Sequence, residues 1–134
     1  MIIHKLQKKP PPKLCQSLCR FEEQFLYPLG TKQFFRIVHD DDYPRFFRAM
    51  GEGICFVAER DERILGVMGA ALRCLALPGG GNRKVVYLGD VKIEPAARGG
   101  RTLFRLAGAV QQWVGTRTDA AIAVVMDGTS TLPS

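Results

Sequence analysis

The stretch "VKIEPAARGGRTLFRLAGAVQQWV", from Val91 to Val114, contains the transition that decides the fold. An apolar strand reaches Pro95, an Arg-Gly-Gly-Arg turn follows, and the next residues have helical spacing. The helix carries an apolar stripe at a period of 3.6 residues, formed by Leu103, Leu106, Ala107, Val110 and Val114. A glycine turn lets backbone N–H groups approach an anion, and the start of a helix adds unsatisfied N–H groups and partial positive charge. The residues fit either a plain turn or an anion site, and the strand-turn-helix context favours the anion site.

The strand that leads into this turn, expected over 85–94, has two unlike faces. One face is apolar along its length, with Val85, Tyr87, Val91 and Ile93. The other face starts apolar and becomes polar, with Val86 and Leu88 followed by Asp90, Lys92 and Glu94. Ligands of open α/β sheets bind at the carboxyl ends of strands. We therefore expect the polar half of this face to be open to water or to a ligand.

The remainder of the chain predicts a mixed sheet with helices. In the first half we expect a helix from Leu14 to about Tyr27, a strand over 33–39, and a short helix that is capped by Asp41 or Asp42 and ends at Met50. In the second half we expect strands over 54–60 and 63–77, a loop over 78–82, and a final strand over 120–127. The tight turn at Asp61-Glu62 makes the middle pair an antiparallel hairpin. The last strand is apolar throughout and should run parallel to 85–94 across the helix. The fold class is α/β, an antiparallel hairpin followed by a parallel β-α-β unit.

Composition places this chain of 134 residues in one domain with a net charge of +6. We expect a flexible basic and proline-rich tail over 1–13, a helical extension over 14–32 and the main domain over 33–134. No apolar run is long enough to cross a membrane, and no secretory signal is visible, so the expected location is the cytoplasm. The cysteines at 15, 19, 55 and 74 have no zinc-ligand spacing, and we expect no metal site but reduced, mostly buried thiols.

Three segments together resemble the GCN5-related N-acetyltransferases, the GNAT superfamily. They are "FRIVHDDDYPRFFRAMGEG", "ICFVAERDERILGVMGAAL" and "YLGDVKIEPAARGGRTLFRLAGAVQQWV", and the resemblance covers about 34–127. The family's hallmark is a strand ending in V-x-P, then x-x-R-G-x-G-x-G/A, then a helix. Ile93-Glu94-Pro95 matches the first element, and Ala96-Ala97-Arg98-Gly99 matches the start of the loop. Arg101 and Leu103 stand where the family usually has glycine and glycine or alanine.

This resemblance implies acetyl-CoA as the cofactor and an amine as the acceptor. By position, backbone groups of Val91 and Ile93, with Lys92 between them, would hold the pantetheine arm. The pyrophosphate would be held by backbone N–H groups of the loop, at Arg98, Gly99, Gly100, Arg101 and Thr102. The strands at 85–94 and 120–127 would separate to admit the cofactor. Asp90 is the candidate general base and Glu94 the second candidate, because the attacking amine must lose a proton.

A complete domain of this family continues with a helix and two further strands. The chain is therefore expected to be a fragment, and the alternatives are that the missing layer is disordered or is supplied by a partner chain. An unpaired edge at the 120–127 strand predicts either a homodimer through that edge or an unstable isolated domain. The acceptor is expected to be a small molecule or a peptide with a primary amine. Asp40, Asp41 and Asp42 fit either an attraction for a cationic amine or a helix cap with solvated neighbours.

Three functions from different classes fit these observations. The first is an N-acetyltransferase that uses acetyl-CoA, and the second is a GNAT-like module that binds CoA without catalysis. Arg101, Leu103 and the absent C-terminal elements favour the second. The third is a basic nucleic-acid-binding domain, which ranks last because the aromatic residues fall at positions expected in the core.

Overall fold

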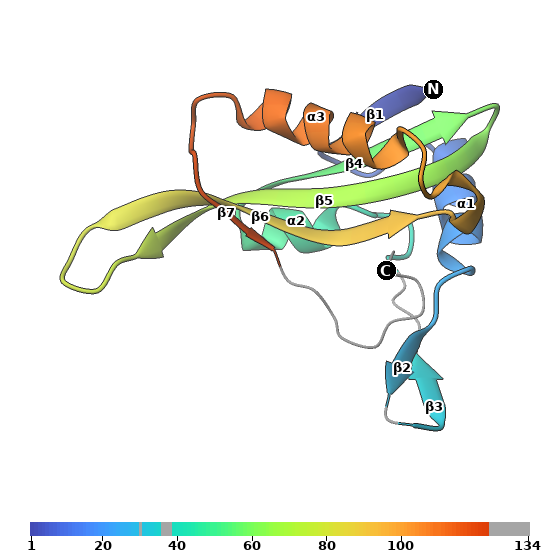
Figure 1. Cartoon of the computed structure of the whole chain (residues 1–134), viewed down its shortest axis with the longest axis horizontal. Helices are drawn as coiled ribbons and strands as arrows, with labels where there is room; N and C mark the ends of the chain where they lie inside the picture. The colour runs from blue at the N-terminus through green and yellow to red at the C-terminus, as the bar shows by residue number, and fades with distance from the viewer. Residues whose placement is uncertain (30, 36–38, 124–134) are drawn as a thin grey trace.

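A five-stranded mixed sheet forms the centre of the computed structural model, which describes residues 1–29, 31–35 and 39–123 (Figure 1). Across the sheet the strands are β1 (Ile2–Leu6), β4 (Glu52–Arg60), β5 (Arg63–Ala76), β6 (Asn82–Ile93) and β7 (Ala121–Ala123). The first four are antiparallel to their neighbours, and β7 pairs parallel with β6, with Val86 opposite Ala121. The predicted fold class is confirmed. Residues 124–127 of the predicted last strand lie outside the described residues.

The helices cover the two faces of the sheet, with α3 (Thr102–Val114) on one face and α1 (Pro12–Glu22) and α2 (Arg45–Met50) on the other (Figure 1). A separate two-stranded hairpin of β2 (Tyr27–Leu29) and β3 (Gln33–Phe35) projects from the helix-covered sheet. Of the strand predicted over 33–39, the first three residues form β3, and 36–38 are not described. The hairpin of β5 and β6 extends beyond the helices at the opposite end of the molecule (Figure 1).

Both faces of β4 are buried because it is a central strand between two layers of helices. Ile54, Phe56 and Ala58 face the core under α3, while Cys55 and Val57 face the core under α1 and α2. The first core is completed by residues of α3 and β5, among them Leu106, Val110, Val114, Met68, Ala70 and Leu72. The second core is completed by Leu14, Leu18, Phe21, Phe25, Tyr43 and Phe47.

The N-terminal segment is part of this architecture. Ile2–Leu6 pairs along its whole length with β4, with Leu6 opposite Cys55, so the prediction of a flexible tail over 1–13 is wrong there. Leu14, Leu18 and Phe21 of α1 lie in the same core as β4, so α1 packs as a layer of the domain and not as an extension of it. The helix itself is confirmed, although it ends at Glu22 rather than near Tyr27.

The short helix α2 begins at Arg45, after Pro44, and the predicted cap by Asp41 or Asp42 is wrong because Pro44 is the N-cap residue. The Asp42 carboxylate instead accepts hydrogen bonds from both terminal nitrogens of the Arg48 guanidinium, with Nη1 2.8 Å from Oδ1. The absence of a side chain at Gly69 allows α2 to pack closely on the sheet, because a Cβ there would lie 2.1 Å from the Phe47 ring. Of the four thiols only Cys55 is buried, so the expectation of mostly buried cysteines is also wrong.

A β-bulge on β6 changes which face its side chains occupy. Gly69 of β5 is opposite Gly89 and Val67 is opposite Lys92, so β6 has one residue more than β5 between these pairs. Asp90 lies in the left-handed region with φ of 50°, which asparagine and aspartate tolerate better than most residues. Before the bulge, even-numbered residues face α3, and after it Val91 and Ile93 do. The regular alternation predicted over 85–94 is therefore wrong after Gly89.

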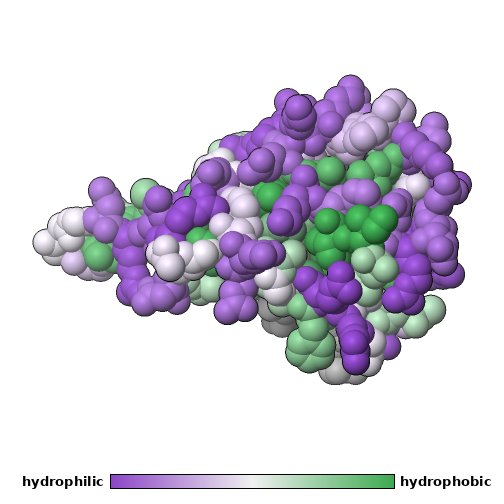
Figure 2. All heavy atoms as spheres, turned by 90° about the horizontal axis from the view of Figure 1, so that it is seen from above, coloured by the Kyte–Doolittle hydropathy of each residue, from purple (hydrophilic) through white to green (hydrophobic). Residues whose placement is uncertain are grey.

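Helix α3 is confirmed. It ends at Val114, and Gly115, with φ of 56°, follows it. Its buried stripe differs from the prediction, because Thr102, Leu106, Val110 and Val114 are buried while Leu103 and Ala107 are exposed. Leu103 is 40% exposed and Phe104 79% exposed on this helix. Figure 2, which views this side, shows apolar residues surrounded by hydrophilic ones. Among the described residues, no helix is long and apolar enough to cross a membrane.

Candidate functional site

The turn between β6 and α3 lines a cavity of about 830 Å³. After β6, a 3₁₀ turn (Pro95–Ala97) leads to Gly99, whose φ of 82° is a conformation that glycine adopts without strain. A Cβ at Gly99 would meet no atom within 4 Å, so the backbone there is open on that side. The helix then begins at Thr102 without a side-chain cap, which leaves the amides of its first turn available to an acceptor.

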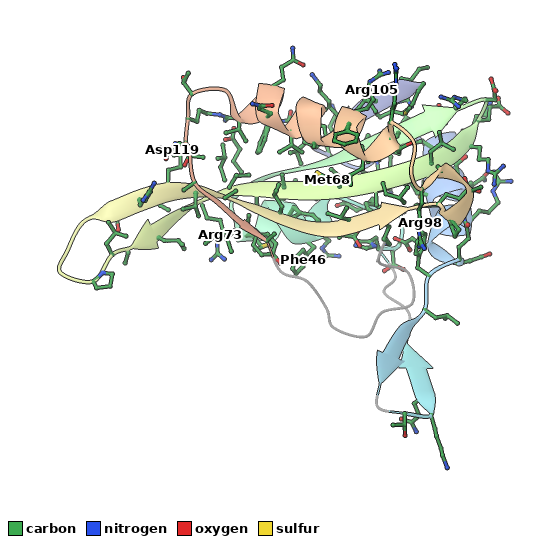
Figure 3. All side chains as sticks on the ribbon, viewed as in Figure 1. Phe46, Met68, Arg73, Arg98, Arg105 and Asp119 are labelled. Carbon is green, nitrogen blue, oxygen red and sulfur yellow. The ribbon has the colours of Figure 1, made fainter. Side chains whose placement is uncertain are left out.

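The cavity is strongly basic. Its wall contains two carboxylates, Asp61 and Glu94, and five arginines, namely Arg60, Arg63, Arg98, Arg101 and Arg105. Arg60, Asp61 and Arg63 come from the turn between β4 and β5, which therefore faces the turn between β6 and α3 across the cavity. Figure 3 shows Arg98 and Arg105 at this end of the sheet, with Arg105 projecting from α3. A concave basic wall beside a helix amino terminus attracts phosphate groups.

Glu94 is buried within this wall. Its side chain forms an ion pair with Arg63 through Oε1, while Oε2 is buried and has no hydrogen-bond partner in the described part of the chain. A buried carboxylate oxygen with no partner is costly, so Oε2 is a ready acceptor for a donor placed in the cavity. Glu94 therefore lies with the loop residues and lines the same cavity, whereas Asp90 does not line it.

The edge of β6 beyond Leu88 is not covered by β7 in the described residues, because β7 pairs only with Val86, Tyr87 and Leu88. The Glu94 amide donates to Leu65 of β5 at 2.8 Å, so by alternation the backbone groups of Ile93 and Val91 point to the opposite edge. Arg98 Nε donates to the Ile93 carbonyl at 3.3 Å on that side. This edge leads directly to the Arg98 turn.

The other face of β6 holds a buried cluster of five polar side chains, the carboxylate cluster, formed by Glu22, His39, Tyr43, Asp90 and Lys92. The Asp90 carboxylate accepts a hydrogen bond from the Tyr43 hydroxyl at 2.8 Å, and its other oxygen lies 3.1 Å from Lys92 Nζ. His39 Nε2 lies 3.4 Å from Asp90 Oδ2, and His39 Nδ1 contacts the Glu22 carboxylate. The Asp90 side chain is 10% exposed and that of Lys92 3% exposed, so both charges are almost removed from water.

Aromatic rings enclose the cluster. The His39 ring stacks on Tyr43 with centroids 4.1 Å apart, and Lys92 Nζ lies 5.7 Å from the Phe25 centroid and 5.6 Å from that of Tyr43. Burial, followed by the negative charges of Asp90 and Glu22, raises the pKa of the Tyr43 hydroxyl well above its usual value. Tyr43 therefore stays protonated and donates its hydrogen to Asp90.

Comparison with known proteins finds solved structures of similar fold but no match in sequence. No family model matches the chain, and no curated protein matches its sequence. A mutant of the BH1408 protein from Bacillus halodurans superposes with a TM-score of 0.63 at 23% identity, covering 95% of this chain and 83% of that one. The aminoglycoside N-acetyltransferase AAC(6')-Iy in complex with CoA superposes with a TM-score of 0.61 at 17% identity, covering 96% and 82%. An acetyltransferase from Trypanosoma brucei superposes with a TM-score of 0.59 at 14% identity, covering 94% and 84%.

The fold is that of the GNAT acetyltransferases. The strand-turn-helix that predicted it from the sequence is the β6–α3 unit of the structure. At these identities the likeness concerns the arrangement of the chain, so the site must be assessed from the residues of this GNAT fold themselves.

The structure separates the residues predicted for the site into two groups. Arg98, Gly99, Gly100, Arg101 and Thr102 line the basic cavity, together with Glu94. Asp90 and Lys92 lie in the carboxylate cluster, on the face covered by α1 and α2. The expected open polar face of β6 is wrong, because Lys92 and Glu94 are each 3% exposed and form ion pairs with Asp90 and Arg63.

Sequence reasoning missed Glu22, His39 and Tyr43. One signal was present, since Glu22 follows Leu18 by four residues and so falls on the apolar stripe of α1, where it is buried. A carboxylate on an apolar stripe needs a buried partner. The partners themselves, His39 and Asp90, depend on the path of the α1–α2 connection and on the bulge, and no local pattern encodes either.

Proposed function

We propose that this chain transfers an acetyl group from acetyl-CoA to a primary amine. The observation that carries the proposal is the basic cavity at the amino end of α3, joined to the uncovered edge of β6. The basic cavity fits phosphate groups, and the uncovered edge of β6 fits an extended arm that contains amides. The GNAT fold supports acetyl transfer in general, and the aminoglycoside N-acetyltransferase complex supports CoA as the ligand.

The pyrophosphate of CoA would lie at the turn over Arg98, Gly99, Gly100, Arg101 and Thr102. Two of these amides already donate within the turn, Arg98 to Pro95 and Gly100 to Ala97, both at 3.3 Å. These bonds are long, and they hold the turn in the shape that exposes Gly99 and the first amides of α3. The arginine side chains around the cavity then supply the positive charge that a pyrophosphate needs.

The pantetheine arm would lie along Val91 and Ile93, whose backbone groups point to the uncovered edge of β6. The Lys92 side chain takes no part in this contact because it points into the carboxylate cluster. When bound, acetyl-CoA supplies a thioester as the acyl donor. The chain's own part is to hold the acceptor amine beside it and to accept the proton that the amine loses.

Asp90 is the residue that we assign to proton acceptance. It lies at the bulge, next to the edge assigned to the pantetheine arm, and keeps a tenth of its side chain exposed. Glu94, the second candidate from the sequence, fits a cofactor-binding role better because it is in the basic cavity with Arg63. The acceptor class is a small molecule or peptide with a primary amine. A second aminoglycoside acetyltransferase of similar fold, meta-AAC0020 in complex with sisomicin, at 17% identity and a TM-score of 0.60, supports a small-molecule amine.

The test is a calorimetric titration of CoA and acetyl-CoA into the chain and into the variants Arg101→Glu and Arg73→Glu. Arg101 lines the cavity, whereas Arg73 lies on β5 and does not line it (Figure 3). Reversing a charge beside the phosphates should weaken binding about tenfold, equivalent to about 1.4 kcal/mol, while the Arg73 variant binds as the parent does.

Release of free thiol in the presence of a panel of primary amines then tests transfer. Binding without thiol release would assign a CoA-binding module without catalysis, and no binding to either ligand would contradict both acyl-CoA functions. The panel should contain aminoglycosides, polyamines and lysine peptides, because these differ in size while sharing the amine.

We also propose that two copies pair through β7, which is the edge strand of the sheet in the described residues and exposes Ile122. Light scattering after gel filtration measures the mass directly. A dimer that is lost in the variant Ile122→Lys supports pairing through this edge, and a monomer at all concentrations contradicts it.

A further inference from the structure

Two members of the carboxylate cluster, Glu22 and His39, have no part in the function proposed above. Glu22 is the last residue of α1 and His39 belongs to the connection between α1 and α2, yet both are buried against β6. The His39 ring lies between two carboxylates, with Nδ1 at Glu22 and Nε2 at Asp90. The His39 backbone N–H also points to Glu22 Oε2 at 3.4 Å.

The two contacts of the ring determine which nitrogen carries hydrogen. A neutral imidazole has one N–H donor and one bare nitrogen. The Nδ1 contact with Glu22 is the closer one, so Nδ1 is the donor to that carboxylate. Nε2 is then bare in the neutral ring and faces Asp90 Oδ2 across 3.4 Å, too far for a strong hydrogen bond. A single proton placed between Nε2 and Oδ2 converts this gap into a hydrogen bond.

Two carboxylates and one lysine surround the ring. Glu22 and Asp90 lie on its two sides, and Lys92 contacts Asp90. Cys55 of β4 lies nearby. Its pKa is raised by burial first and by the Asp90 charge second, so its thiol stays neutral. A positive charge that develops on the His39 ring would therefore have a carboxylate on each side.

We propose that Glu22, His39 and Asp90 form a proton relay in which Asp90 receives the proton of the acceptor amine and shares it with His39 Nε2. This inference rests on the proposed acetyl transfer. As the N–C bond to the acetyl group forms and the C–S bond of the thioester breaks, one N–H bond of the amine breaks and its proton enters the relay. The same proton leaves to the departing CoA thiolate, directly or through water, so the relay is restored after each turnover.

Both oxygens of Asp90 already have a donor from the protein. Tyr43 donates to one of them at 2.8 Å, and Lys92 Nζ lies 3.1 Å from the other. His39 supplies the additional acceptor, and Glu22 stabilises the positive charge that then develops on the ring. Tyr43 and Lys92 are positioning residues that hold both Asp90 oxygens in place.

The first test compares the variant His39→Asn with the control His4→Asn. The asparagine amide can still donate to Glu22 in place of Nδ1, but it has no basic nitrogen in place of Nε2. His4 offers a matched control because its Nε2 also contacts a glutamate, Glu59, at 3.1 Å, on β1 away from the cluster. The relay predicts a loss in kcat of about a hundredfold for His39→Asn with unchanged CoA affinity, and no loss for His4→Asn.

The pH profile separates a relay from a structural role. In the parent, kcat should fall at acidic pH, because a relay that already holds a proton cannot accept the proton of the amine. In His39→Asn this acidic part of the pH profile should change shape, while the folded fraction of the protein stays constant. An unaltered kcat and an unaltered profile in His39→Asn, with CoA binding retained, would overturn the relay.

The second test does not require turnover and so separates the relay from the proposed function. In a chain labelled with ¹⁵N-histidine, only His4 and His39 give imidazole signals, and the His4 variant assigns them. The relay predicts that neutral His39 carries its hydrogen on Nδ1, and that the variant Glu22→Gln weakens this preference. Hydrogen on Nε2 in the neutral ring would overturn the relay even if acetyl transfer is established. If no amine is acetylated while the Nδ1 form is found, the proposed acetyl transfer fails, whereas the hydrogen bond from His39 Nδ1 to Glu22 and the bare Nε2 facing Asp90 stand.

Discussion

The two faces of the carboxyl end of β6 handle charge in opposite ways. On one face the basic cavity gathers five arginines against two carboxylates, so an excess of positive charge borders an open space. On the other face the carboxylate cluster buries two carboxylates with one ammonium, a histidine and a tyrosine, nearly closed to water. The cavity leaves its charge for a ligand to balance, whereas the cluster balances most of its charge internally.

A single inserted residue determines on which face of β6 Asp90 and Lys92 lie. Without the bulge at Asp90, the alternation of β6 would place Asp90 and Lys92 with Val86 and Leu88, under α3. The bulge turns them towards α1 and α2, and keeps apolar Val91 and Ile93 under α3. One backbone irregularity therefore separates the proposed cofactor side from the proposed proton-accepting side within five residues of one strand.

The largest expected effect comes from removing the only ammonium of the carboxylate cluster. In the variant Lys92→Met, two buried carboxylates keep only His39 and Tyr43 as partners, and an uncompensated buried charge is strongly destabilising. We expect a loss of about 3–5 kcal/mol in the free energy of unfolding, measured by urea denaturation. The control is Lys84→Met on the exposed part of β6, which should change little.

A double variant tests whether charge causes this loss. Lys92→Met combined with Asp90→Asn removes one carboxylate as well, so it should be more stable than Lys92→Met alone. If the double variant is the less stable of the two, packing rather than charge explains the loss, and the contrast between the two faces is not electrostatic.

The pH dependence of stability gives an intermediate effect. Because the pKa of Tyr43 is raised above its ordinary value of 10.0 by burial and by Asp90, the unfolded chain loses this proton first as the pH rises. The contribution of Tyr43 to the free energy of unfolding is therefore complete below about pH 10. Above that pH it decreases, at up to about 1.4 kcal/mol per pH unit. Burial raises the pKa of Cys55 in the same direction, from 9.0, so the decline begins slightly earlier.

Urea denaturation at several values from about pH 8 to about pH 11 measures this slope in the parent and in Tyr43→Phe. The variant should have a flatter slope above about pH 10, because its ring has no proton to lose. Equal slopes in both proteins would show that Tyr43 is not the group that titrates inside the cluster.

The sequence was sufficient for features that depend on local order. The strand, Pro95, the Arg98–Arg101 turn and the helix that follows predicted the β6–α3–β7 unit, and the Asp61-Glu62 turn predicted the β4–β5 hairpin. Both residues of that turn have positive φ, at 52° and 66°, which is the geometry of tight hairpin turns. Such features are determined by a few consecutive residues, so a single sequence contains them.

The features that failed depend on contacts between distant segments. Ile2–Leu6 looks like a basic tail because its pairing partner, β4, lies some fifty residues away. Asp90 looked exposed because alternation assumes no bulge, and the bulge is stabilised by Tyr43 and Lys92 only once the layers have packed. Leu103 was predicted to be buried because it extends the apolar stripe of α3 in the sequence. In the structure Thr102 takes the buried position of the first turn, close to Gly66.

The smallest expected effect concerns an ion pair at the surface, which tests whether burial is what makes the carboxylate cluster costly to disturb. Lys13 of α1 and Glu62 of the β4–β5 turn form a pair whose side chains are 75% and 72% exposed. Their contact raises the pKa of Lys13 and lowers that of Glu62, yet water screens both charges. The variant Lys13→Gln should therefore leave the urea midpoint unchanged at low and at high salt. A loss as large as that of Lys92→Met would mean that ion pairing alone, and not its removal from water, determines the cost.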